Sequence, residues 1–140
     1  MRNLIALFVL AFTLVLSASA QEANSGFARR VTYQTLTDAA PIAWSLSSAV
    51  VGNAIVTLNH ATGTRALNVS NLLAGGDYKL FVHQDATGGA ALTFGTGCTW
   101  KVSGNGSGAI TLTSTASAVD LLTIRYDGTI CWTTLTANFN

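Results

Sequence analysis

The segment HQDATGGAALTFG, residues 83–95, gathers in one stretch the residue types that could bind a ligand or a metal. His83 and Asp85 carry lone pairs, and the pair Gly88-Gly89 could let backbone N–H groups approach a phosphate. A phosphate-binding loop, however, also needs a lysine and a following helix, and the TGG triplet is followed by neither. A short acid can instead accept backbone N–H groups two residues on. We therefore predict a hairpin turn built on Asp85, Gly88 and Gly89.

The histidines and acids elsewhere offer little to a catalytic mechanism. His60 lies in a turn-rich stretch and is expected to be a solvated loop residue. No G-x-S-x-G elbow is present, and no residue pair has nucleophile–base spacing. Asp120 and Asp127 come nearest to a glycosidase carboxylate pair. Asp127 belongs to a turn, and Asp120 is expected to accept backbone N–H groups at a strand start. The sequence therefore predicts no catalytic residue.

Metals, cofactors and nucleic acids are likewise not expected as partners. The acids are scattered and form no D-x-[DN]-x-[DN]-G calcium loop. The two cysteines have no histidine cluster with which to complete a tetrahedral zinc site. Without Arg2, six basic residues balance six acids, so the chain has no basic patch for nucleic acid.

The three tryptophans allow two interpretations. Trp44, Trp100 and Trp132 alternate with small or polar residues in predicted strands, as large core residues of a sandwich do. Exposed on one face, they would instead form a platform on which sugar rings stack. Both alternatives stay open at this point.

The two cysteines are expected to form a disulfide. Cys98 and Cys131 lie in a chain whose first twenty residues are expected to direct export, and an even cysteine count in an oxidising compartment favours a bridge. Two separate buried thiols are the alternative. The bridge would contribute about 3 kcal/mol by closing the intervening loop.

The first twenty residues have the order of a secretory signal peptide. Arg2 precedes an apolar run over residues 4–16, and the small-residue stretch SASA ends at residue 20. The run is short for a membrane span, so no stable span is expected after cleavage. Residues 21–30 are expected to be a flexible lead and residues 31–140 a single domain. The predicted location is periplasmic or extracellular, either secreted or at the cell surface.

The remaining sequence is typical of an all-β fold. Short β-branched and aromatic runs recur every ten residues or so between Gly, Asn, Asp and Ser. We predict nine to ten short strands in an antiparallel, jelly-roll-like β-sandwich. They cover residues 31–36, 42–46, 53–58, 65–69, 77–84, 90–94, 98–102, 109–113, 119–126 and 130–135. The pair Asp127-Gly128 between the last two runs is a strong hairpin signal.

Three stretches resemble a known family. They are TLTDAAPIAWSL, LLAGGDYKLFVHQDATGGAALTFG and TLTSTASAVDLLTIRYDGTICW. Together they resemble a β-rich domain found at the C-terminal ends of tail-fibre and other surface-fibre proteins of tailed phages and prophages. The resemblance covers about residues 35–140. It implies a fibre or receptor-contacting module, often oligomeric, and no catalytic residues.

The chain departs from that family pattern in two ways. Here the domain is expected to stand alone behind a signal peptide, and Cys98 and Cys131 are not part of the pattern. We therefore expect an exported, non-enzymatic structural or adhesive surface module. It would form a homo-oligomer, either a trimer or a filament, or bind a surface glycan or protein receptor. If the chain is phage-encoded, it would lie on the virion surface. A secreted, lectin-like carbohydrate-binding domain is the alternative, and a small exported hydrolase the weaker one.

Overall fold

The computed structural model describes residues 32–46, 52–60, 63–104 and 109–139. The predicted signal peptide and flexible lead lie outside the described residues. Within the described ranges, no helix is long and apolar enough to cross a membrane.

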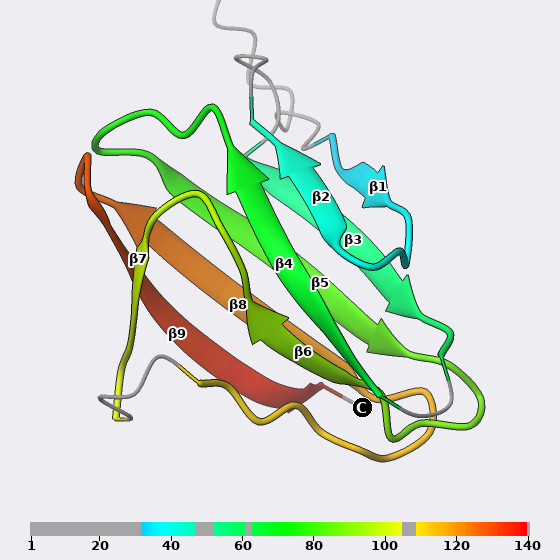
Figure 1. The fold of residues 1–140 in the computed structure, drawn as a ribbon. Coiled ribbons are helices and arrows are strands. Elements are labelled where there is room, and N and C mark those ends of the chain that lie inside the picture. Colours follow the sequence, from blue (N-terminus) through cyan, green and yellow to red (C-terminus); the bar gives the residue numbers. More distant parts are fainter. Residues whose placement is uncertain (1–31, 47–51, 61–62, 105–108, 140) are drawn as a thin grey trace, which may run out of the picture.

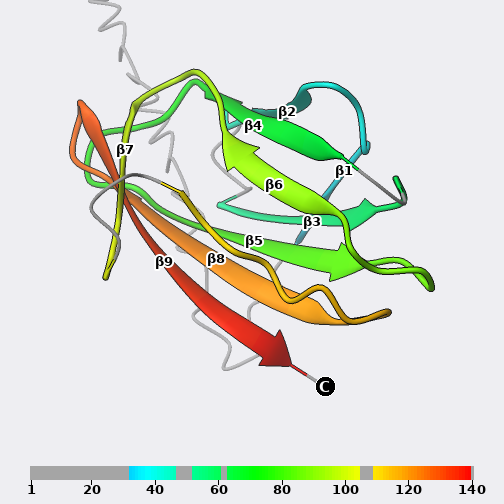
Figure 2. The same cartoon turned by 60° about the horizontal axis from the view of Figure 1, so that its bottom comes forward.

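The described chain is all-β, as predicted, and its nine strands form two sheets (Figure 1). The strands are β1 (Gln34–Leu36), β2 (Ile42–Ser45), β3 (Asn53–Leu58), β4 (Thr64–Ser70), β5 (Asp77–Gln84), β6 (Ala91–Phe94), β7 (Thr99–Val102), β8 (Val119–Tyr126) and β9 (Ile130–Phe139). The larger sheet has the order β1-β3-β5-β8-β9-β7, and the smaller has the order β2-β4-β6. Figure 2 shows them as two facing layers.

From β1 to β7 the chain alternates between the two sheets. Among β1 to β6, two strands that are neighbours in one sheet are therefore separated in sequence by a strand of the other sheet. Leu36 lies in register with Val56, and Val56 with Val82, so the strands β1, β3 and β5 stack in parallel. The strands β2, β4 and β6 stack in the same way. The first six strands thus wind as three flattened coils, as in a two-sheet solenoid.

The prediction of antiparallel pairing is wrong for most of the described strands. Five ladders are parallel, and only those between β5 and β8 and between β8 and β9 are antiparallel. Alternation of apolar and polar residues specifies which face of a strand is buried, but it carries no information about the direction of the neighbouring strand. The two-sheet arrangement is present, whereas the jelly-roll topology is not confirmed.

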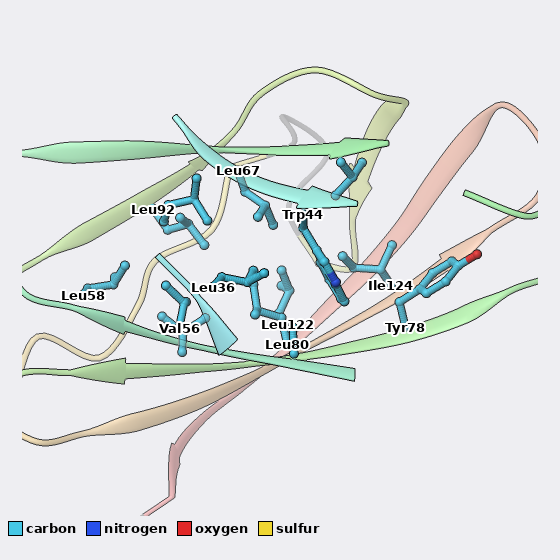
Figure 3. Close-up of a cluster of buried hydrophobic side chains, with 14 of the residues drawn as sticks. Leu36, Trp44, Val56, Leu58, Leu67, Tyr78, Leu80, Leu92, Leu122 and Ile124 are labelled. Atoms are coloured by element: carbon cyan, nitrogen blue, oxygen red, sulfur yellow. The ribbon is translucent and has the colours of Figure 1, made fainter. Parts of the chain in front are cut away.

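The core fills the space between the two sheets (Figure 3). Alternate residues of each strand point inward, so β5 buries Tyr78, Leu80 and Val82 and exposes Asp77 and Lys79. The fully buried side chains come from both sheets. The largest are Trp44, Ile42, Leu58, Leu67, Leu80, Leu92, Leu122 and Ile124. Their burial against one another is the dominant stabilising contribution to the fold.

One predicted strand, residues 109–113, is not a strand in the structure. Ile110 and Leu112 still pack against the core. The N–H and hydroxyl groups of Thr113 bond to the carboxylate of Asp120, at 2.7 and 2.8 Å. The segment therefore covers the core with its apolar side chains while its backbone bonds to a side chain instead of a ladder.

Candidate functional site

The outward face of the larger sheet carries a row of chemically active side chains across four strands. Asp77 of β5 lies opposite Arg125 of β8. Arg125 lies opposite Trp132 of β9, and Trp132 lies opposite Lys101 of β7. All four side chains are exposed, because they occupy the outward positions of alternating strands.

A groove of about 620 Å³ follows this row. Besides the four residues of the row, Ser103, Thr123 and Thr134 contribute to its lining. With Val102 and Thr133, which complete its lining, the groove combines one aromatic ring, three charged groups, four hydroxyl-bearing residues and one valine. Such a surface can pack against the apolar face of a ligand and hydrogen-bond to groups on its rim.

Trp132 is 50% exposed, yet its indole is held in place. Its N–H donates to Oδ2 of Asp127 at 2.8 Å. The other carboxylate oxygen of Asp127 accepts the backbone N–H groups of Ile130 and Thr129, at 2.7 and 2.9 Å. These hydrogen bonds, that of Ile130 foremost, hold the pKa of Asp127 below its ordinary value. The predicted turn at Asp127 and Gly128 joins the antiparallel strands β8 and β9 and also positions the exposed tryptophan.

The other two tryptophans do not reach the groove. Trp44 is fully buried in the core, where its ring meets that of Tyr78 edge-on at 6.2 Å. Trp100 stacks on Phe94 with ring centroids 4.1 Å apart and donates its N–H to the carbonyl of Gly95. These two residues act as packing residues, and Trp132 alone of the three retains the ligand-facing interpretation.

The structure contains a disulfide between Cys98 and Cys131, as the sequence predicts. It joins the residue before β7 to β9. β7 is the last strand in the order of the larger sheet, and β9 is its one neighbour there. The bridge therefore helps to hold Lys101 beside Trp132.

The stretch 83–95 is a bend, but the hairpin interpretation is wrong. Oδ1 of Asp85 accepts the N–H groups of Thr87 and Gly88, both at 2.8 Å, as an acid at a turn is expected to do. Gly88 and Gly89 have positive φ angles of 71° and 81°. However, β5 and β6 belong to different sheets, so the turn is an arch from one layer to the other. No groove residue comes from it.

Sequence reasoning missed a buried polar cluster around Asp38. This carboxylate is 1% exposed and accepts hydrogen bonds from Nδ1 of His60 at 2.7 Å and from the N–H of Asn59 at 2.9 Å. Nε of Arg65 lies 3.2 Å from its other oxygen. Burial raises the pKa of Asp38, but the hydrogen bonds from His60 and Asn59 and the charges of His60 and Arg65 bring it below the ordinary value.

The expectation that His60 is solvated is therefore wrong, because its side chain is only 7% exposed. The partners of Asp38 lie 21 to 27 residues away in sequence, so no local spacing connects them. Nε2 of His60 is buried without a hydrogen-bond partner among the described residues. A histidine–carboxylate pair becomes a catalytic base only when a nucleophile or substrate meets Nε2. The contacts described here tie the β1–β2 connection to β3 and β4.

Asp120 is the second buried carboxylate, at 2% exposure. It accepts the backbone N–H groups of Thr113 and Asn138, in agreement with the expected structural role. In the described ranges, no group of three or more His, Cys, Asp or Glu residues is arranged to hold a metal ion.

Comparisons of the chain with protein-family models, with curated protein sequences and with solved structures found no match. The groove around Trp132 is therefore interpreted from its own geometry.

Proposed function

We propose that this protein is an exported, non-enzymatic adhesive module that binds a surface glycan through the groove around Trp132. The observation that carries the proposal is the half-exposed indole, fixed by Asp127 and lying in a groove that charged and hydroxyl-bearing residues also line. This function combines the two expectations drawn from the sequence, an adhesive surface module and a lectin-like carbohydrate-binding domain.

The chemistry of the groove suits a sugar. One face of a sugar ring presents C–H groups that pack on an indole, while hydroxyl groups project from its rim. Thr123, Thr134 and Ser103 line the same groove and offer hydroxyl partners. A ring already held by a hydrogen bond loses little conformational entropy on binding, which favours affinity.

Export is supported by two features. The disulfide is of the kind that persists in oxidising compartments. The leader-like residues 1–20 are the second feature. A secreted or cell-surface location follows, or a virion surface if the resemblance to phage fibre domains reflects the origin of the chain.

A second candidate function is self-assembly, with a second copy of this chain as the partner. Away from the groove, the outward face of the larger sheet becomes apolar. There Ile55, Phe81 and Leu121 lie in one row. The exposed Phe139 and Tyr33 extend this apolar area, and Tyr33 packs edge-on against Phe81 at 5.7 Å. A trimer or filament would cover such a surface. Light scattering of the purified protein tests this, and a monomer at high concentration would refute it.

The glycan-binding proposal is tested on a glycan array that displays both neutral and acidic oligosaccharides. The labelled protein should bind a subset of glycans, and Trp132→Ala should lose that binding. Leu73→Ala removes another exposed apolar side chain that lies outside the groove, and it should bind as the unchanged protein does. Absence of binding to every glycan, or equal binding by Trp132→Ala, would refute the proposal.

A further inference from the structure

We propose that the glycan is acidic, and that Arg125 and Lys101 recognise a carboxylate on the sugar that stacks on Trp132. This inference rests on the proposed function and names its ligand class. The register of the sheet places one cation on each side of the tryptophan, Arg125 on β8 and Lys101 on β7.

The guanidinium of Arg125 is available to a ligand. Its one described ion pair joins Nε to Oδ1 of Asp77 at 3.9 Å, and both side chains are exposed. A long, solvated pair of this kind contributes little free energy, so a ligand can displace it at small cost. The planar guanidinium fork matches the two oxygens of a carboxylate and can bind them together.

Lys101 supplies the second positive charge. Among the described residues, no carboxylate lies within ion-pair distance of its amino group. It sits on the far side of Trp132 from Arg125, and neighbouring strands lie about 4.8 Å apart. A carboxylate at the edge of a stacked sugar ring would therefore come within reach of one cation or the other.

Two acids lie near these cations, and each already has partners of its own. Asp127 is engaged by the indole N–H and by backbone N–H groups. Asp77 lies at the outer end of the row, beyond Arg125. The order across the sheet is thus acid, cation, tryptophan, cation, which places one cation on each side of the aromatic ring.

This charge is a local feature. The whole chain has a formal net charge of +1, so a general attraction of polyanions is not expected. Preference for acidic sugars would have to come from the groove itself.

The test uses carboxylated oligosaccharides, namely oligogalacturonate, oligoalginate and sialyllactose, each paired with its neutral methyl ester. Isothermal titration calorimetry should show that the protein binds at least one acid more tightly than its ester, and that added salt weakens this binding. Arg125→Ala should lower the affinity for that acid roughly tenfold or more, because it removes hydrogen bonds to a charged group. Lys101→Ala should lower it roughly two- to fivefold.

Two matched variants sharpen the result. Lys79 is an exposed cation one row away, opposite Thr123, and does not line the groove, so Lys79→Ala should change the affinity by less than about twofold. Asp77→Asn removes a repelling charge and the competing partner of Arg125, so it should leave acid binding unchanged or tighten it. If Asp77 instead bound sugar hydroxyl groups, Asp77→Asn would weaken the binding of the acidic glycan.

The outcomes separate this inference from the function on which it rests. Equal binding of acid and ester, or binding of neutral glycans alone, would overturn the acidic ligand while the glycan-binding function stands. Absence of binding to all probes and to the whole array would overturn both. Acid binding that persists unchanged in Trp132→Ala would also overturn both, because it would show attraction without the tryptophan.

Discussion

The indole N–H of Trp132 donates to the carboxylate of Asp127 across the turn between β8 and β9, at 2.8 Å. One acid thus closes a turn and orients an exposed aromatic ring. We expect Asp127→Ala to lower the melting temperature and to weaken glycan binding. The substitution removes the hydrogen bonds that close the turn together with the one that orients the indole. Asp85→Ala is the matched control, since Asp85 closes a turn in the same way but lies away from the groove. It should lower the melting temperature and leave glycan binding intact.

The same carboxylate predicts how Trp132 responds to acid. The pKa of Asp127 is held below its ordinary value of 3.8, so its hydrogen bonds are fully present above that pH and are lost as the pH falls through the lower folded value. Fluorescence of a Trp44→Phe, Trp100→Phe variant, which reports Trp132 alone, should stay constant from pH 7 to about 4 and change only below. A transition centred near pH 6 would contradict this assignment.

Asp38 should be one of the most sensitive polar positions for stability. Replacing it by alanine leaves the side chains of His60 and Arg65 without the carboxylate that they share. We expect Asp38→Ala to cost about 3 kcal/mol of unfolding free energy, measured by urea denaturation at pH 7. Asp38→Asn should cost less, because it keeps an oxygen acceptor.

The pH dependence of that cost has a defined sign. The folded pKa of Asp38 is lowered, so its stabilising contribution is present above pH 3.8 and is lost as the pH falls through the folded value. The difference between the unchanged protein and Asp38→Ala should therefore shrink in acid. A difference that is the same at pH 7 and at pH 2 would refute the ion-pair interpretation.

Removal of the disulfide should affect both stability and binding. The bridge closes a loop between cysteines 33 residues apart, and its loss should cost about 3 to 4 kcal/mol. Because β7 carries Lys101, the double variant Cys98→Ala, Cys131→Ala should also exchange the β7 amide hydrogens faster and bind acidic glycan more weakly. Hydrogen exchange measures the first effect and calorimetry the second. An unchanged rate of amide hydrogen exchange in β7 would show that the ladder with β9 holds this strand in place without the disulfide.

Gly88 should not tolerate a side chain. Its φ angle is positive, and a Cβ atom there would lie 2.5 Å from the carbonyl oxygen of Ser114. We expect Gly88→Ala to cost more than about 2 kcal/mol, combining backbone strain with this clash. Gly75 also has a positive φ angle but open space around it, so Gly75→Ala should cost about 1 to 2 kcal/mol. Equal costs would show that the clash relaxes.

The faces of the strands could be predicted from sequence, whereas their directions could not. Alternation in β5 correctly places Tyr78, Leu80 and Val82 on one face with Gln84, and all four are buried. Alternation is the same for a parallel and an antiparallel neighbour. The arch after Gln84 therefore resembled a hairpin in the sequence, although it leads to the other sheet.

The site was only partly predictable for a related reason. Trp44 and Trp132 both sit in alternating strands, and the sequence does not state which face of each strand turns toward the second sheet. The partners of Asp38 are distant in the chain, and no motif joins them. The Asp127-Gly128 turn was visible from sequence because all of its hydrogen bonds are local.

The coiled winding of β1 to β6 makes the length of this protein adjustable. Each coil contacts chiefly its neighbours, so a coil could be duplicated or deleted at the β1–β2 end without altering the ladders among β5, β8, β9 and β7. Such a change would move the groove farther from that end, or closer to it, while its four facing side chains kept their register. In this fold, the distance of the groove from the β1–β2 end can therefore change without a change in the side chains that line it.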